Sequence, residues 1–150
     1  MNGDPEDIRG WHRLDAATTT SGLLAEGDFA RLAAIGVRTI INLALADSPG
    51  ILPDEGARCA AVGIDYRHVA IPFAAPEDHH FAAFRAAITA AQAPVHVHCV
   101  MNWRVSACFY RLHREQGMAP AEARMLLNRH WDPLTSDHPD AAAWAAFMAR

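Results

Sequence analysis

The stretch Val95–Ser106 reads Val-His-Val-His-Cys-Val-Met-Asn-Trp-Arg-Val-Ser, and its pattern decides the fold. Its first part, Val95 to His98, alternates valine with histidine and predicts a short buried strand. A helical pattern follows from Val105 to Gln116. A strand that runs through a short loop into a helix places Cys99 just ahead of a helix N-terminus.

This loop carries the groups of an anion site. The unpaired N–H groups and the dipole of a helix N-terminus attract an anion and favour a thiolate nearby. Arg104 adds a planar, permanently charged donor fork that suits phosphate oxygens. The set predicts a cysteine-dependent phosphate-ester hydrolase, with Cys99 as nucleophile and Arg104 as clamp. The alternative is that Cys99 is an inert core residue.

The loop resembles the phosphate-binding loop of cysteine-dependent protein phosphatases of the tyrosine and dual-specificity type, in their small bacterial form. Three further stretches follow in that family's order: Thr20-Ser21-Gly22, 40–43 and 63–72. The resemblance implies a thiophosphoryl-enzyme intermediate and a supporting role for His98. It also implies a phosphate-binding loop made of Val100, Met101, Asn102, Trp103, Arg104, Val105 and Ser106.

The loop differs from the family's in its spacing. Four residues separate Cys99 from Arg104, where the family has five, although Ser106 stands where the family's hydroxyl stands. Either the loop is one residue shorter and Arg104 faces the anion, or the arginine has slipped and Val105 takes the clamp position. The family's loop glycine is also missing, and Asn102 is the one residue here that readily adopts a left-handed backbone.

The altered spacing leaves two other functions open. A catalytically weak or inactive pseudophosphatase would bind phosphate without turning a substrate over. A rhodanese-like sulfurtransferase would use the tighter loop for a persulfide on Cys99.

The general acid is not fixed by the sequence. In the family it follows the strand that ends at Ile71-Pro72, and Phe73 holds that position here. Asp78 is the predicted acid, with Glu77 and Asp132 as alternatives. Carboxylates in the first turn of a helix are also favoured simply by its dipole.

Histidines and cysteines outside the loop could support other chemistry. His96 and His98 share one face of a strand and could ligate a metal, as could His79-His80. No carboxylate stands at a convincing ligand spacing, so we predict no metal and no cofactor. The remaining cysteines, Cys59 and Cys108, are expected in the core, with Cys108 alternatively a second thiol for oxidised Cys99. Trp103 is expected to pack into the core or to flank the site.

Strand and helix patterns alternate along the whole chain. Strands are expected at 14–19, which would be an edge strand, and at 37–43, 66–71 and 95–98. Helices are expected at 26–35, 54–62, 77–91, 105–116, 120–130 and 138–150. The pattern predicts one α/β domain over residues 1–150, with a mainly parallel sheet of about four to five strands flanked by helices.

Composition limits the classes of molecule that this chain is expected to bind. The 150 residues are 51% hydrophobic, which is typical of a globular chain. The net charge is −4 and the basic residues are not clustered, which argues against nucleic acid. No stretch is apolar enough for a membrane span. Three cysteines and a polar N-terminus predict a cytoplasmic protein. The expected partners are a phosphorylated protein or a small phosphate ester, with inorganic phosphate or sulfate able to occupy the loop.

Overall fold

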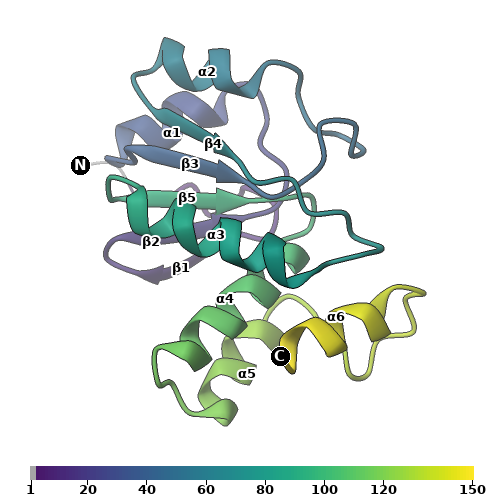
Figure 1. The fold of residues 1–150 in the computed structure, drawn as a ribbon. Helices are drawn as coiled ribbons and strands as arrows, with labels where there is room; N and C mark the ends of the chain where they lie inside the picture. The colour runs from purple at the N-terminus through teal and green to yellow at the C-terminus, as the bar shows by residue number, and fades with distance from the viewer. Residues whose placement is uncertain (1–2) are drawn as a thin grey trace.

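A five-stranded sheet forms the centre of the molecule (Figure 1), in a computed structural model that describes residues 3–150. The order of its strands is β1-β2-β5-β3-β4. Within the described residues, β1 and β2 pair antiparallel and the three other strand pairs are parallel. The strands are β1 (His12–Asp15), β2 (Thr18–Ser21), β3 (Thr39–Asn42), β4 (Asp65–His68) and β5 (Val95–His98). The predicted α/β class with a mainly parallel sheet is confirmed.

Six helices are described, and they flank the sheet (Figure 1). They are α1 (Asp28–Ala34), α2 (Glu55–Ala61), α3 (Asp78–Ala90), α4 (Trp103–Glu115), α5 (Pro120–Asn128) and α6 (Ala141–Met148). Each lies within a predicted helix or overlaps most of it. Most of the observed helices begin or end a few residues inside the predicted bounds, whereas α4 begins at Trp103, two residues before the predicted start. Differences of this size are usual at helix ends.

Two hydrophobic cores lie on opposite faces of the sheet. Neighbouring residues of a strand point to opposite faces, so Ile40 and Ile41 of β3 belong to different cores. Ile40 packs with residues of α1 and α2, including Leu32 and Cys59. Ile41 belongs to the larger core under α3, α4 and α6. Helices therefore cover both faces of the sheet, and α5 and α6 pack against α4 (Figure 1).

The predicted edge strand at 14–19 is wrong in its placement. The chain forms two short strands there, joined by the turn at residues 16–17. Thr18–Ser21 pairs parallel with β5, so β2 lies inside the sheet and β1 forms its edge. The polar threonines of β2 concealed this position in the sequence. Their burial brings the end of β2 beside the end of β5.

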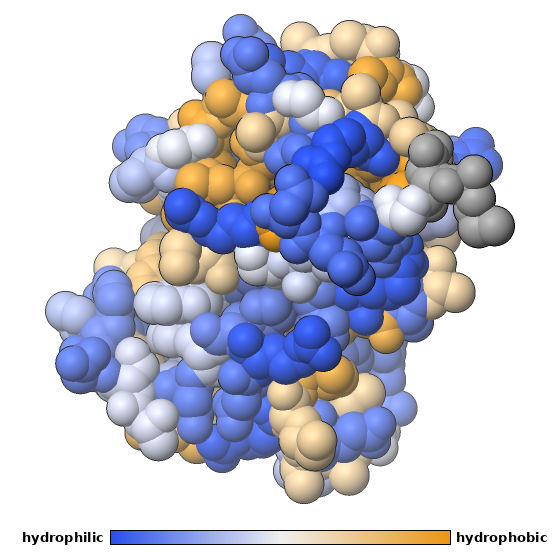
Figure 2. Space-filling model, turned by 180° about the vertical axis from the view of Figure 1, so that it is seen from behind, coloured by the Kyte–Doolittle hydropathy of each residue, from blue (hydrophilic) through white to orange (hydrophobic). Residues whose placement is uncertain are grey.

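The surface is mostly polar on the face opposite to that of Figure 1. Figure 2 shows hydrophilic residues over its centre, with smaller hydrophobic areas separated by polar ones. In residues 3–150, no helix has the length and apolar character needed to cross a bilayer.

Candidate active site

A cavity of about 270 Å³ opens where β5 ends and α4 begins. Cys99 and Arg104 both line it, as the sequence predicts for a shared site. Both side chains are mostly buried, with 1% of Cys99 and 6% of Arg104 exposed. The other lining residues are Pro49, Phe73, Val100, Met101, Trp103 and His138.

The backbone of the loop is free to bind an anion. Among the described residues, no acceptor receives a hydrogen bond from the N–H groups of Val100 to Val105. The first helical hydrogen bond of α4 runs from the N–H of Ser106 to the carbonyl oxygen of Asn102. Consecutive free N–H groups at a helix N-terminus form a preorganised anion site.

Asn102, the loop residue that most readily tolerates a left-handed backbone, adopts one, with φ of +68°. Its side-chain nitrogen donates to the carbonyl oxygen of Gly10 at 2.8 Å and to the hydroxyl of Thr20 at 3.0 Å. The same nitrogen lies 3.3 Å from Nε2 of His130. Asn102 therefore supplies a left-handed position in the loop, and its side chain ties the loop to β2.

Arg104 and Val105 point in different directions. Nη1 of Arg104 donates to the carbonyl oxygen of Ile71 at 3.0 Å, and its guanidinium lies 5.6 Å from the centre of the Phe73 ring. Val105 is fully buried in the larger core. The hydroxyl of Ser106 donates to the carbonyl oxygen of Trp103. Arg104 therefore lines the cavity, whereas Val105 belongs to the core.

Both ring nitrogens of His98 lie within hydrogen-bond distance of an oxygen atom. Its Nδ1 is 3.2 Å from the carbonyl oxygen of Cys99, and its Nε2 is 2.8 Å from Oε1 of Glu55. Both side chains of this pair are buried. Sequence reasoning missed Glu55, because a carboxylate at the start of α2 gives no sign of where it is directed.

His96 is equally occupied, so the two strand histidines do not form a free metal site. Its Nδ1 and Nε2 each lie 2.8 Å from a hydroxyl oxygen, those of Thr19 and Ser21 respectively. Complete burial, with a smaller contribution from His98, holds the pKa of His96 well below its ordinary value. His96 is a neutral, structural histidine of the sheet.

The end of β2 supports the loop from the other side. The N–H of Cys99 donates to the carbonyl oxygen of Ser21, and the N–H of Leu23 donates to that of Val100. Gly22 stands between them, and a Cβ atom there would lie 2.4 Å from the oxygen of Val100. Glycine is thus required for this close approach, which explains the Ser21-Gly22 sequence.

Aromatic rings form the wall of the cavity. Trp103 stacks on Trp131 with ring centroids 4.7 Å apart, and Phe73 lies 6.1 Å from Trp103. His138 meets Phe73 edge to face at 5.0 Å. Trp103 therefore both packs and flanks the site. His138 was missed from the sequence, because it lies in the segment between α5 and α6, far along the chain from Cys99.

The predicted acids lie outside the residues that line the cavity. Asp78 is exposed and forms ion pairs with Arg111 at 3.1 Å and Arg150 at 3.3 Å. The hydrogen bond from Arg111 holds the pKa of Asp78 below its ordinary value, which does not suit a proton donor. Asp132 pairs with Arg124. The geometry gives the prediction of Asp78 as acid no support.

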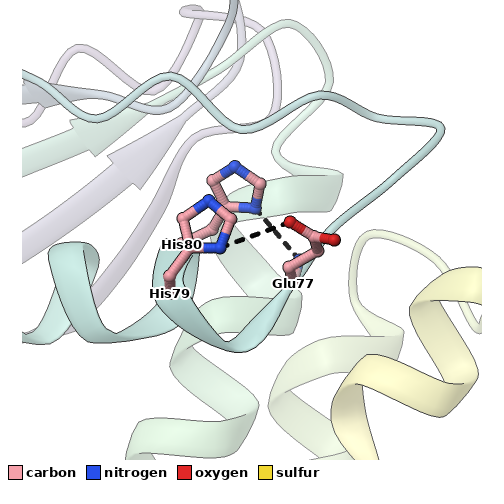
Figure 3. Close-up of side chains that lie close together, drawn as sticks. All are labelled: Glu77, His79 and His80. Atoms are coloured by element: carbon pink, nitrogen blue, oxygen red, sulfur yellow. Dashed lines mark hydrogen bonds and ion pairs between the residues drawn. The ribbon is translucent and has the colours of Figure 1, made fainter.

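Glu77, His79 and His80 form a small cluster at the start of α3 (Figure 3). Nδ1 of His79 lies 3.3 Å from Oε2 of Glu77, and Nδ1 of His80 accepts the N–H of Glu77 at 3.0 Å. Their ligand atoms lie within 4.8 Å of one another, close enough to hold a metal ion. None of the three lines the cavity of Cys99.

The other two cysteines lie in the cores, as predicted. Burial raises the pKa of the Cys59 thiol to about 12, with a smaller contribution from Glu55. Burial also raises the pKa of Cys108. Both thiols are therefore poor nucleophiles at neutral pH.

A family model matches residues 13–113, which include the whole loop. It describes the phosphatase-like domain of beta-lactamase hydrolase-like proteins. No curated protein sequence matched the chain.

Several solved structures are similar over nearly the whole chain. One is the "Putative phosphatase (DUF442)" of Shewanella putrefaciens CN-32, with 26% identity, 96% of this chain and 89% of that chain covered, and a TM-score of 0.80. TpbA of P. aeruginosa shares 18% identity, with coverages of 98% and 86% and a TM-score of 0.72. The catalytic domain of the PP-IP phosphatase SIW14 of S. cerevisiae, solved with citrate, shares 16% identity, with coverages of 92% and 86% and a TM-score of 0.71. The last two show the fold alone.

Proposed function

The chain belongs to the family of phosphatase-like domains of beta-lactamase hydrolase-like proteins, and on that premise we propose that it hydrolyses phosphate monoesters through Cys99. The observation that carries the proposal is the shared cavity of Cys99 and Arg104 beneath a loop of free N–H groups. These are a nucleophile, a charged clamp and an anion cradle within one site.

The chemistry follows from these groups. The Cys99 thiolate attacks phosphorus, a sulfur–phosphorus bond forms, and the ester bond to the leaving oxygen breaks. Arg104 and the loop N–H groups bind the other phosphate oxygens, on which charge develops. Water then attacks the thiophosphoryl intermediate and releases inorganic phosphate with free Cys99.

The aromatic wall favours an aryl ester such as phosphotyrosine. Phe73 and Trp103 offer ring faces beside Arg104, and aromatic side chains pack well on such surfaces. A variant of TpbA, a protein of the same fold, has been solved in complex with pTyr.

The test is turnover of phosphotyrosine peptide and of small aryl phosphates by the natural protein and by Cys99→Ser. We expect phosphate release by the natural protein and none above background by the variant. A matched Cys59→Ser variant should keep its activity, since Cys59 lies in the other core. Equal release by the natural protein and Cys99→Ser would refute the proposal.

A binding protein without turnover is the second candidate. The observation in its favour is that no carboxylate of residues 3–150 lines the cavity. It predicts that calorimetry detects phosphate or phosphopeptide binding, which Arg104→Ala weakens, while no substrate is hydrolysed. Neither the matching family nor the structures named above favour the sulfurtransferase alternative. An assay of sulfur transfer from thiosulfate to cyanide would test that alternative.

A further inference from the structure

The cavity offers few groups that can assist a leaving oxygen. Among the residues that the structure describes, its titratable side chains are Cys99, Arg104 and His138, and none is a carboxylate. Asp78 and Asp132 are engaged elsewhere by arginines. For a phosphate ester bound by Cys99 and Arg104, His138 is therefore the remaining titratable side chain of the cavity.

The ring of His138 packs against two aromatic rings of the cavity lining. It meets Phe73 edge to face at 5.0 Å and Trp103 at 6.0 Å with a 90° angle between the planes. Its backbone N–H donates to the hydroxyl of Ser136, and its carbonyl oxygen accepts from Ala141. The segment before α6 thus places the ring of His138 in the cavity lining, against Phe73 and Trp103.

The hydrogen bonds of the ring also determine which nitrogen carries the proton. Nδ1 accepts the N–H of Asp140 at 3.1 Å, and a nitrogen that accepts a hydrogen bond bears no proton. The neutral ring of His138 therefore carries its proton on Nε2. Residues 3–150 provide no acceptor for this N–H, whereas a substrate oxygen in the cavity would.

We propose that His138 is a catalytic residue whose Nε2–H donates a hydrogen bond to the leaving oxygen as Cys99 attacks phosphorus. This rests on the proposed function. The sulfur–phosphorus bond forms, the ester bond breaks, and its electron pair leaves with the oxygen as an anion stabilised by Nε2–H. Water supplies the proton to that oxygen afterwards, and His138 keeps its own.

A donor that keeps its proton suits a restricted class of substrates. Leaving groups must be stable as anions, which phenolates are and simple alkoxides are not. The substrate class is therefore aryl phosphate rather than the phosphate esters of serine or threonine. The rings of Phe73 and Trp103 beside His138 fit the same class.

Two matched substitutions distinguish the roles of the two ring nitrogens of His138. His138→Asn places an amide oxygen near Nδ1, so it keeps an acceptor for Asp140 but removes the donor. His138→Gln places an amide N–H near Nε2 and keeps the donor. Both are compared with the natural protein on 2,4-dinitrophenyl, 4-nitrophenyl and phenyl phosphate, with Cys99→Ser as the blank and thermal unfolding as the check of folding.

We expect kcat/KM of His138→Asn to fall about 10- to 100-fold on phenyl phosphate and less than about three-fold on the dinitrophenyl ester. His138→Gln should recover part of the loss. The natural protein alone should hydrolyse phenyl phosphate far faster than an alkyl phosphate. A loss that is equal across the aryl esters, or absent, overturns the role of His138 while Cys99-dependent turnover stands. No Cys99-dependent turnover of any ester overturns the proposed function itself, and this inference with it.

Discussion

Nε2 of His98 lies 2.8 Å from Oε1 of Glu55, although the two residues are 43 positions apart in the chain. Both side chains are buried, and the other ring nitrogen of His98 is directed at the carbonyl oxygen of Cys99. The start of α2 is thereby connected to the peptide group of the candidate nucleophile. Removing one partner of such a buried pair leaves the other unsatisfied.

The pair predicts unequal effects for two substitutions of Glu55. Glu55→Ala should lower the free energy of unfolding by about 3–5 kcal/mol, because it leaves Nε2 of the buried His98 without its partner. Glu55→Gln keeps an acceptor for His98 and should cost clearly less. Urea unfolding measures both, and phosphatase assays should show the larger loss of kcat/KM for alanine. Equal stability of the two variants would contradict the structural role of the pair.

Gly22→Ala tests the close approach between β2 and the loop. The added Cβ would lie 2.4 Å from the oxygen of Val100, so the loop backbone must move. Because small displacements in a preorganised site cost much catalysis, kcat/KM should fall at least about 10-fold. Gly27→Ala is the matched control, since a Cβ there meets nothing within 4 Å. Similar kinetics in both variants would count against the contact.

Asn102 can be divided into its backbone and side-chain roles. Asn102→Gly keeps the left-handed backbone but loses the hydrogen bonds to Gly10 and Thr20. Asn102→Ala loses the same hydrogen bonds and must also hold an ordinary residue in the left-handed conformation. Since that conformation costs an ordinary residue about 1–2 kcal/mol, the alanine variant should be less stable than the glycine variant by that amount. Thermal unfolding of the two variants decides this, and a more stable alanine variant would argue against the assigned conformation.

The sequence predicts the fold well wherever local patterns are strong. The apolar, β-branched residues of β3 indicated a buried parallel strand, and the loop between β5 and α4 indicated a left-handed Asn102. It failed at β2, where the buried threonines resemble an exposed edge. Polar residues in a sheet show their burial only through the strands that pair with them.

The sequence could predict which residues share the candidate site only where they lie close together in the chain. Cys99 and Arg104 share a cavity because one loop carries both. Glu55 and His138 reach the site from other segments, and tertiary packing alone brings them there. Asp78 was chosen by its position after β4, but the turn of α3 directs it to Arg111 instead.

Buried histidines predict that stability falls in mild acid. Burial, with smaller contributions from His12 and Arg129, lowers the pKa of His130 from 6.5 to about 4. Below pH 6.5 the unfolded chain binds a proton at this residue that the folded chain does not bind until about pH 4, so protons favour unfolding. The contribution of His130 to the free energy of unfolding should therefore be constant above pH 6.5. It should decrease as the pH falls from 6.5 to about 4, and be constant again below that pH.

His130→Gln isolates this contribution. It removes the titration and keeps a polar group near Asn102. Urea unfolding at pH values from 4 to 7.5 should show a shallower loss of stability for the variant, although His96 still contributes in the same direction. Parallel curves for the variant and the natural protein would show that His130 titrates normally.

Exchanging Arg104 and Val105 tests which residue of α4 faces the anion. The exchange restores the family's spacing, but the structure has Arg104 in the cavity and Val105 fully buried in the core. The double variant would bury a guanidinium and remove the clamp, so we expect activity at least about 10²-fold lower and a marked loss of stability. Arg104→Lys is the control, since it keeps the charge in place but not the planar fork, and should retain more activity than the exchange. An inactive natural protein together with an active exchanged one would show that the arginine has slipped and that the clamp belongs at position 105.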